Sequence, residues 1–251
     1  MTIETTSGHV RASLSDGVLH ICLDRADKHN ALNEAMYADL LRAVQAGSTD
    51  DAVRVLMFTG EGRSFCAGND LADFFRATSG KVGGAVPFIA ALMACPKVVI
   101  AGIQGNAVGI GTTMLLHMDM VVAADDARLI TPFVDLGAVP EAGSAKLLPA
   151  WMGYHQAARM LLLGEPLPAD EAYRCGLLSS VVPLDELQNA VTSMAKSLAA
   201  KPPKALMASK RLMRGAIHRP LDELVDEDMA LFGEMLMGEE SRAAIAAKLK
   251  K

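Results

Sequence analysis

Two glycine-rich segments of the chain have the composition of turns that present backbone amides to a ligand. The first runs from Ser64 to Leu71 (SFCAGNDL) and the second from Gly105 to Gly111 (GNAVGIG). Each follows an expected strand and precedes an expected helix, so its free N–H groups lie at the positive end of a helix dipole. Such amides suit a negatively charged oxygen of any origin. Two such turns in one small domain suggest paired donors that converge on one oxygen.

Each segment also has a simpler or different interpretation. In the first, Asn69 or Asp70 can do no more than cap the helix that follows. In the second, the pattern from Gly109 is G-x-G-x-x-M, and Met114 stands where a dinucleotide-binding motif has a third Gly or an Ala. The chain also lacks GxxxxGKS and GxxxxGKT patterns, which argues against a P-loop.

One carboxylate has unusual surroundings. Glu141 lies in the stretch LGAVPEAGS, among small and apolar residues and directly after Pro140. A glutamate near a helix start is often a surface residue that the helix dipole favours. If the apolar surroundings bury the carboxyl group instead, desolvation should raise its pKa toward about 6–7, a range useful for proton transfer.

Other reactive side chains lack the partners that their chemistry needs. Cys66 has no Cys–His arrangement nearby, which favours a small buried thiol. Ser144 lacks the GxSxG motif of a nucleophile elbow. The six histidines include no HExxH pattern, so we expect no metal site. Three methionines, Met114, Met118 and Met120, are expected in the core.

Composition and cysteine usage narrow the class of protein. A chain of 251 residues can bury a large core and is near the upper size for one domain. Its formal charge of −5 argues against a nucleic-acid partner, which would normally face a basic surface. The four cysteines form no CxxC pair and indicate free thiols in a reducing compartment.

The sequence also lacks the usual targeting signals. Glu4 stands where a signal peptide would have its basic region, and the C-terminal KLKK differs from the peroxisomal SKL. The most apolar region, Val82–Ala124, is interrupted by prolines and polar residues before it reaches the roughly 18–20 apolar residues of a membrane span. We therefore expect a cytoplasmic protein with no membrane partner.

Hydrophobic periodicity predicts alternating strands and helices. A hairpin is expected over Val10–Leu23 around an Asp-Gly turn. Asn33 is expected to cap a helix whose apolar face includes Met36, Leu40, Leu41 and Val44. The other expected strands are Val53–Thr59, Lys97–Ile103 and Met120–Ala124. The other expected helices are Asn69–Ala77, Pro87–Ala94, Gly109–His117, Asp185–Ala200, Lys204–Ile217 and Leu221–Met237.

This alternation predicts an α/β fold with short buried strands. From Tyr154 onward the signals are nearly all helical, so we expect a mixed core over residues 1–190 and a helical C-terminal region over residues 191–251. Charge in that region is uneven. Lys196–Arg219 contains seven bases and no acid, whereas Leu221–Glu240 contains eight acids and no base. These are either solvated faces that pair with each other or a neighbouring subunit, or bases that meet the phosphates of a ligand.

Taken together, the chain resembles the crotonase (enoyl-CoA hydratase/isomerase) superfamily. The segments that carry this resemblance extend over nearly the whole chain and are Asp27–Asn33, Phe65–Leu71, Gly105–Gly111, Thr131–Ser144 and Cys175–Leu178. The resemblance implies a spiral core of ββα turns and a helical C-terminal region that mediates trimerisation. It further implies a homotrimer, often paired into a hexamer, that acts on an acyl-CoA thioester.

The resemblance also implies roles for individual residues. The amides of Ala67 and Ile110 would form an oxyanion hole for the thioester carbonyl. The CoA and substrate site would be lined by Ala26, Lys28, Ala31, Gly68, Asn69, Asp70, Leu71 and Phe133, with Lys28 near the nucleotide or phosphates. Residues Val82–Met93 would shape the acyl-chain pocket.

Two departures from the hydratase pattern bear on the chemistry. Hydratases of this superfamily use two glutamates, and the corresponding positions here hold Thr113 and Phe133, neither of which can activate water. Glu141 instead matches the single glutamate of the peroxisomal-type enoyl-CoA delta isomerases. The sequence therefore predicts a 3-enoyl-CoA to 2-enoyl-CoA isomerase that needs no cofactor, with CoA as part of the substrate. The alternatives are a hydrolase or dehalogenase in which Glu141 is a nucleophile or activates water, and a non-catalytic acyl-CoA-binding protein.

Overall fold

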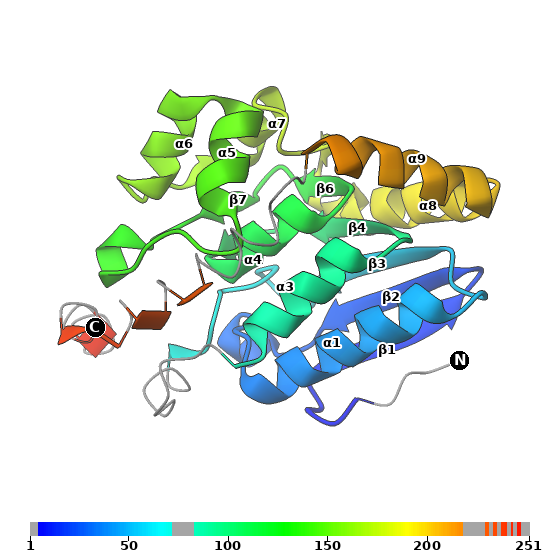
Figure 1. Cartoon of the computed structure of the whole chain (residues 1–251), viewed down its shortest axis with the longest axis horizontal. Coiled ribbons are helices and arrows are strands. Elements are labelled where there is room, and N and C mark those ends of the chain that lie inside the picture. The colour runs from blue at the N-terminus through cyan, green and yellow to red at the C-terminus, as the bar shows by residue number, and fades with distance from the viewer. Residues whose placement is uncertain are drawn as a thin grey trace.

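The structure is a computed structural model that describes residues 5–71 and 83–217 (Figure 1). Of the C-terminal part it also describes residues 229–230, 233–234, 237–239, 242 and 245–246. Most of the helix expected over Leu221–Met237 lies outside the described residues, as do residues 72–77 of the helix expected from Asn69. Val82, the first residue of the expected acyl-chain region, also lies outside them.

The larger sheet has six strands in the order β1-β2-β3-β4-β6-β9. Strands β1 (Val10–Ser15) and β2 (Val18–Leu23) form the expected antiparallel hairpin, and all further neighbours in this sheet pair in parallel. The other members are β3 (Val55–Gly60), β4 (Val98–Ile103), β6 (Met120–Ala124) and β9 (Ser180–Val182). The expected positions of β3, β4 and β6 are thus confirmed to within two residues.

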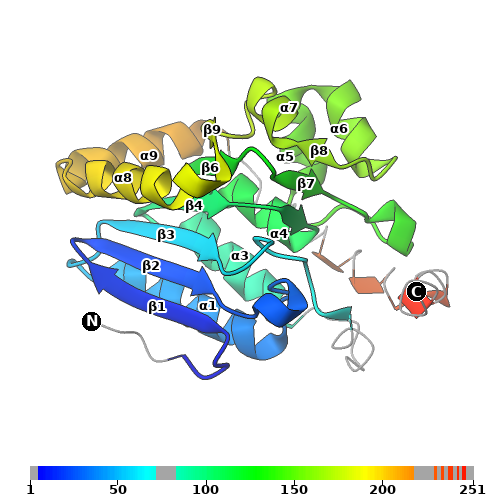
Figure 2. The same cartoon turned by 180° about the vertical axis from the view of Figure 1, so that it is seen from behind.

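Helices cover both faces of this sheet, which explains why β4 is buried along its whole length (Figures 1 and 2). Helices α1 (Glu34–Thr49) and α3 (Ala85–Ala94) lie on one face. Helix α8 (Leu187–Ala199) lies on the other, and α9 (Pro203–Ile217) lies behind α8 in Figure 2 and packs near the start of β4, where Lys210 donates to Lys97 O. The expected helix starts are close to the observed ones, and Asn33 caps α1 as predicted because its side chain accepts a 2.9 Å hydrogen bond from the Met36 amide.

A second sheet has three short strands, β5 (Asn106–Val108), β7 (Arg128–Ile130) and β8 (Leu167–Pro168). Helix α4 (Ile110–Thr113) follows β5 almost directly and continues into a 3-10 helix, η2 (Met114–His117). The sequence pattern predicted one helix here and missed all three strands, since two or three residues are too few to show a period of two. This small sheet carries the second glycine-rich segment.

From Ser144 onward the described residues form α5 (Ser144–Met152), α6 (Tyr154–Leu161), α7 (Ala169–Arg174), α8 and α9. The expectation of nearly uniform helix after Tyr154 is wrong in two places, because β8 and β9 also lie in this stretch. The division near residue 190 stays a prediction. No helix among the described residues is long and apolar enough to cross a membrane.

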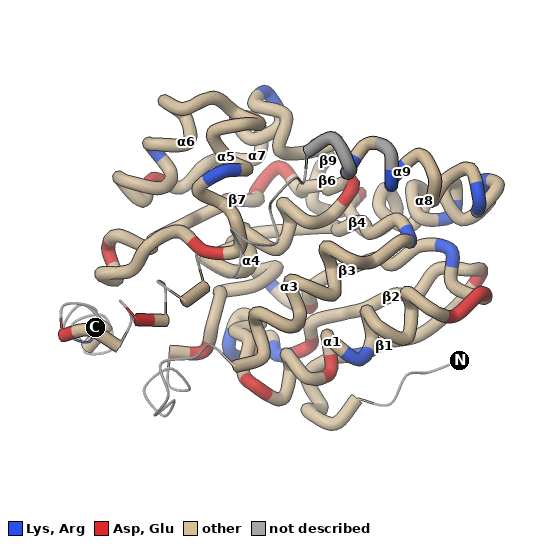
Figure 3. The backbone as a smooth tube through the Cα atoms, in the orientation of Figure 1, with Lys and Arg blue, Asp and Glu red and all other residues tan. Residues whose placement is uncertain are grey.

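Figure 3 marks the basic positions of α9 along the backbone, and two of these residues pair inside the protein. Lys210 and Arg214 of α9 form ion pairs of 2.8 and 3.0 Å with Asp119, which precedes β6. The side chain of Lys210 is only 6% exposed, so this base does not face a solvent-borne ligand. Lys196, by contrast, is exposed and lies 3.7 Å from Asp16. For Lys210 and Arg214 the structure supports internal pairing over phosphate binding.

Candidate active site

The first glycine-rich segment forms an extended strip between residues 29–32 and β5. On one side, the Cys66 amide donates to Asn106 O (3.2 Å), and Cys66 O accepts from the Val108 amide (2.8 Å). On the other side, Leu32 forms an isolated parallel bridge with Asn69. The strip therefore extends the small sheet by one strand and brings the two glycine-rich segments side by side.

Two glycines allow this close approach. Gly68 has a φ of +93°, and a Cβ there would lie 3.0 Å from Val108 O. At Gly111, in α4, a Cβ would lie 2.6 Å from Cys66 O, which is closer than carbon and oxygen can pack. The N-terminus of α4 is thus pressed against the first segment. The expected proximity of the two turns is confirmed.

The hydrogen bonds identify which amides are free to bind a ligand, and Ala67 is not one of them. Its N–H donates to His29 O at 2.9 Å, which contradicts the prediction that this amide forms half of an oxyanion hole. The Asn69 amide is different. In the parallel bridge with Leu32, the flanking groups Gly68 O and Asp70 N make the hydrogen bonds, so the N–H of Asn69 points away from Leu32.

Among the described residues, the backbone amides of Asn69 and Ile110 have no hydrogen-bond acceptor. Ile110 is the first residue of α4, where the helix itself supplies no acceptor. The Ile110 amide is therefore unoccupied, as a donor to a ligand requires, and its part in an oxyanion hole stays a prediction. The other unoccupied amide is that of Asn69, two residues after Ala67. Both free N–H groups belong to the two turns that pack together.

Glu141 lies in a turn before α5 and is completely buried, with no exposed surface. Its position three residues ahead of the helix and its burial exclude the alternative of a surface residue on the first helical turn. The two residues after it, Ala142 and Gly143, both have positive φ angles, of +50° and +72°. This tight turn directs the glutamate side chain into the protein.

Burial raises the pKa of Glu141 to about 7, and one hydrogen bond partly offsets that rise. The donor is Thr113 Oγ1, 3.3 Å from Glu141 Oε1. Among the described residues, Oε2 has no hydrogen-bond partner. A carboxyl group with this pKa and one free oxygen can accept and return a proton near neutral pH.

The charge of Glu141 raises the pKa values of two groups, Cys66 in the first turn and Tyr37 in α1. Burial raises the pKa of Tyr37 well above its usual value, and the charge of Glu141 raises it further. The Tyr37 hydroxyl donates to the side-chain oxygen of Asn69, which connects it to the free amide. Burial likewise raises the pKa of Cys66 to about 12, again with a contribution from Glu141, so the expected inert thiol is confirmed.

The sequence profile of the Enoyl-CoA hydratase/isomerase family matches residues 13–251. The chain belongs to this enoyl-CoA hydratase/isomerase family. It is 36% identical over 236 residues to Enoyl-CoA delta isomerase 2 of Rattus norvegicus, covering 91% of this chain and 60% of that protein. It is 33% identical to a probable enoyl-CoA hydratase of Rhodobacter capsulatus, covering 96% and 95% of the two chains.

A solved structure confirms the expected crotonase-like fold. An enoyl-CoA hydratase/isomerase from Pseudoalteromonas atlantica T6c superimposes with a TM-score of 0.91 at 34% identity, covering 96% of this chain and 97% of that one. The protein is thus an enzyme of the enoyl-CoA hydratase/isomerase family. Its relatives include both isomerases and hydratases, so their names alone do not choose between the two reactions.

All but one of the residues predicted to line the CoA site lie in two adjoining segments, and the exception is Phe133. Ala26–Lys28 form an exposed 3-10 helix, and Lys28 makes no ion pair within the described residues. Ala31 is half-buried, and its carbonyl accepts a 3.0 Å hydrogen bond from Arg25. Arg25 also pairs with Asp70 at 2.7 Å. Asp70 therefore ties the first turn to residues 25–31.

Two other predicted contacts pack into the protein core. Phe133 is only 2% exposed and belongs to the main core cluster, and Leu71 packs against that cluster from a half-buried position. Phe133 immediately precedes a 3-10 helix, Val134–Leu136, on the same connection that leads to Glu141. Their contact with substrate stays a prediction.

Sequence reasoning missed Asn30, which organises the first turn. Asn30 is completely buried and has a φ of +59°. Its side-chain nitrogen donates to Glu61 O, Ser64 O and Phe65 O, and its oxygen accepts from the Arg25 amide. The available signal was the residue type, because asparagine tolerates the left-handed region better than most residues.

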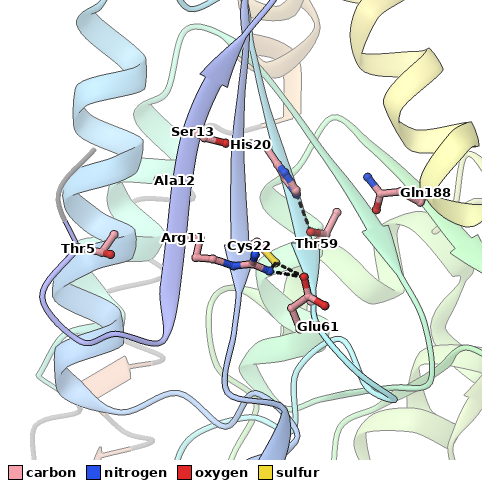
Figure 4. A pocket seen from close by; sticks show the side chains of 10 residues that line it. Thr5, Arg11, Ala12, Ser13, His20, Cys22, Thr59, Glu61 and Gln188 are labelled. Atoms are coloured by element: carbon pink, nitrogen blue, oxygen red, sulfur yellow. Dashed lines mark hydrogen bonds and ion pairs between the residues drawn. The ribbon is translucent and has the colours of Figure 1, made fainter. Parts of the chain in front are cut away.

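A separate pocket of about 630 Å³ lies on the sheet face opposite α1 and contains none of the predicted site residues (Figure 4). Its walls include His20, which hydrogen-bonds Thr59 at 2.7 Å, and Arg11, which pairs with Glu61. Within the described parts of the chain, no group of three His, Cys, Asp or Glu side chains is arranged to hold a metal ion.

The buried carboxyl group predicts a pH-dependent stability. The pKa of Glu141 is about 7 in the folded protein, against an ordinary value of 4.5 in the unfolded chain. Between these two pH values the folded state therefore binds a proton that the unfolded state has lost. The free energy of unfolding of the wild type should therefore fall, relative to Glu141→Gln, as pH rises from 4.5 to 7. By 1.36 kcal/mol per pKa unit, the change is at most on the order of 3 kcal/mol.

Urea unfolding of both proteins at pH 5 and pH 8 measures this difference. Glu141→Gln should gain stability over the wild type at pH 8 and lose most of that gain at pH 5. A difference that stays constant across this range would show that Glu141 is ionised normally in the folded protein.

Proposed function

We propose that this enzyme converts a 3-enoyl-CoA to a 2-enoyl-CoA through a dienolate. The observation that carries the proposal is the environment of Glu141. This carboxyl group is fully buried, has a pKa of about 7 and leaves one oxygen without a hydrogen-bond partner among the described residues. It also acts electrostatically on Cys66, the residue of the first turn that contacts α4.

The proposed reaction moves one proton. The thioester oxygen accepts hydrogen bonds from the amides of Asn69 and Ile110, where the negative charge of the dienolate develops. Glu141 removes a proton from the α carbon, and the electrons of that C–H bond move toward the thioester carbonyl, which gives the dienolate. The same carboxyl group then returns the proton to the γ carbon, which leaves the double bond between the α and β carbons.

Hydration is the competing reaction, since relatives of similar identity carry hydratase names. Adding water requires one group that activates the water and another that delivers a proton. Thr113 contacts Glu141 directly but cannot serve as that second group, because a neutral hydroxyl is too weak an acid or base. This contact favours isomerisation, in which a single carboxyl group suffices.

The proposed isomerisation leaves the oxidation state of the substrate unchanged, so it calls for no redox cofactor. The proposal also includes no metal, and CoA enters only as part of the substrate. We include in the proposal a homotrimeric or hexameric assembly and a cytoplasmic location. Sedimentation equilibrium of the purified protein tests the assembly, and fractionation of the source cells tests the location.

Purified protein mixed with 3-hexenoyl-CoA tests the reaction directly. The ultraviolet absorbance of the conjugated thioester should rise, with no release of free CoA. Incubation with 2-hexenoyl-CoA provides the comparison, because hydration would remove that absorbance. Release of free CoA would instead support hydrolysis, and tight binding without turnover on a panel of thioesters would support an acyl-CoA-binding protein.

The hydrogen bond from Thr113 should influence the pH at which Glu141 ionises, and therefore the pH below which activity falls. Thr113→Val removes the hydrogen bond that favours the ionised form of Glu141, so the pKa of Glu141 should rise further. We expect the acid limb of kcat/KM to move to higher pH by roughly 0.5–1 unit, given the usual strength of such a bond.

Thr112→Val is the matched control for this change. Thr112 is the buried neighbour in α4, and its hydroxyl donates to Ala107 O rather than to Glu141. The Thr112→Val variant should therefore have a lower unfolding midpoint, while the acid limb of its kcat/KM profile stays at the wild-type pH. If both variants shift the pH profile equally, the hydrogen bond from Thr113 does not control the ionisation of Glu141.

A further inference from the structure

The turn that carries Glu141 holds its backbone in a conformation that needs support. Ala142 has a φ of +50°, in the left-handed region that an L-residue other than glycine rarely adopts. Such conformations persist only where the surrounding structure fixes them. Two groups do so here: Ser144 donates to Glu141 O, and the His117 ring lies 2.8 Å from Ala142 O through its Nε2 atom.

His117 is completely buried at the end of η2 and has no part in the proposed proton transfer. A carbonyl oxygen can only accept a hydrogen bond, so the Nε2 atom that faces Ala142 O must carry a proton. The side chain therefore reaches from η2, which continues the helix that carries Thr113, to the turn that carries Glu141. The His117 hydrogen bond thus joins the α4–η2 segment to the turn at residues 141–143. The distance between these two elements determines the 3.3 Å contact between Thr113 and Glu141.

The backbone of His117 is fixed in turn by the C-terminal region. Arg214 of α9 donates a hydrogen bond to His117 O and pairs with Asp119. Lys210, one helical turn earlier, pairs with the same aspartate but donates to Lys97 O instead. Of these two neighbouring bases, Arg214 is the one that reaches the backbone of His117.

We propose that His117 is a positioning residue for Glu141: its ring holds the Ala142 carbonyl, and Arg214 holds His117 in place. The catalytic part rests on the proposed function, because it takes Glu141 as the proton carrier. A displacement of about 1 Å at such a group can lower a rate about a hundredfold. Loss of the His117 hydrogen bond should therefore reduce turnover more than substrate binding.

Two substitutions at His117 separate positioning from packing. His117→Met fills a similar volume but cannot donate a hydrogen bond, whereas His117→Gln keeps a side-chain N–H. With 3-hexenoyl-CoA, His117→Met should lower kcat by about ten- to a hundredfold and leave KM within about twofold. His117→Gln should recover most of kcat. Equal loss in both variants, or no loss in His117→Met, would overturn the proposal.

A second readout does not depend on which reaction the enzyme catalyses. In protein labelled with 13C at the glutamate carboxyl carbons, the Glu141 signal is assigned by its absence in Glu141→Gln. Its titration should move in His117→Met and return toward wild type in His117→Gln. Thr113, which hydrogen-bonds Glu141, is unchanged in these variants, as are Tyr37 and Cys66, whose pKa values the charge of Glu141 raises. An identical titration in all of them would overturn the positioning role even if isomerase activity were absent.

Arg214→Met and Lys210→Met test the connection to α9. Each removes one base from Asp119, but only the first removes a contact with His117. Arg214→Met should lower kcat and shift the Glu141 titration in the same direction as His117→Met. Lys210→Met should lower the unfolding midpoint and leave kcat within about twofold. If Lys210→Met reduces kcat as much as Arg214→Met, general loosening of α9 explains both effects and the proposed connection is wrong.

Discussion

Replacing Glu141 with glutamine is expected to lower kcat for 3-hexenoyl-CoA by about a thousandfold, since a positioned acid or base contributes roughly 10²–10⁴ to a rate. Glutamine has nearly the same shape and can keep the contact with Thr113, but it cannot take a proton. KM should change little because, in the proposed mechanism, backbone amides elsewhere hold the thioester oxygen. Initial rates over a range of substrate concentrations measure both quantities.

The pH profile should support the same assignment. Glu141 must be ionised to remove a proton, so wild-type kcat/KM should fall as pH drops through the pKa of about 7. The residual activity of Glu141→Gln should lack this limb. Glu61→Gln is the control, because Glu61 is exposed and lies in the separate pocket with Arg11. A Glu141→Gln enzyme within tenfold of wild type would refute the role of this residue.

The parts of the site that could be predicted from sequence depend on local signals. Glycine-rich turns between strand and helix are visible within eight residues, and Glu141 stands out because its neighbours are small and apolar. In the structure the turns pack together as expected, and the carboxyl group is buried, which is one of the two alternatives that the sequence left open. Local sequence thus identified the chemical groups of the site.

The identity of the second free amide required a contact that the local sequence does not show. Ala67 and Asn69 are two residues apart in one turn, and either could present its N–H group. His29 and Leu32 decide between them, because the strip from residue 66 to residue 70 pairs with this earlier segment. Without the register of that pairing, the choice of Ala67 could not be corrected.

The same reasoning applies to the residues that the sequence did not single out. Asn30 fixes three carbonyl groups more than 30 residues along the chain, and Tyr37 reaches the side chain of Asn69. The strands β5 and β7 have three residues each, so their pairing, rather than their composition, defines them. Long-range contacts therefore supply the precision of a site whose groups are locally recognisable.

Gly111→Ala is expected to lower kcat by at least about a hundredfold, although alanine is the better helix former. A Cβ at this position would lie 2.6 Å from Cys66 O and 2.9 Å from Cys66 Cβ. Because the first of these is a backbone atom, the two turns must move apart. That movement displaces the amides of Asn69 and Ile110, and loss of one such donor typically costs 10²–10³ in kcat.

Gly102→Ala separates this effect from ordinary crowding of the core. A Cβ at Gly102, in β4, would lie 3.0 Å from Val191 Cγ1, a side-chain atom of α8 and not part of either turn. Overpacking there should cost about 1–3 kcal/mol of stability and leave kcat within about threefold. Binding of a non-hydrolysable enolate analogue, measured by calorimetry, should weaken in Gly111→Ala alone. Equal loss of kcat in both glycine variants would mean that the turns hold no catalytic donors, because crowding anywhere in the core would then suffice.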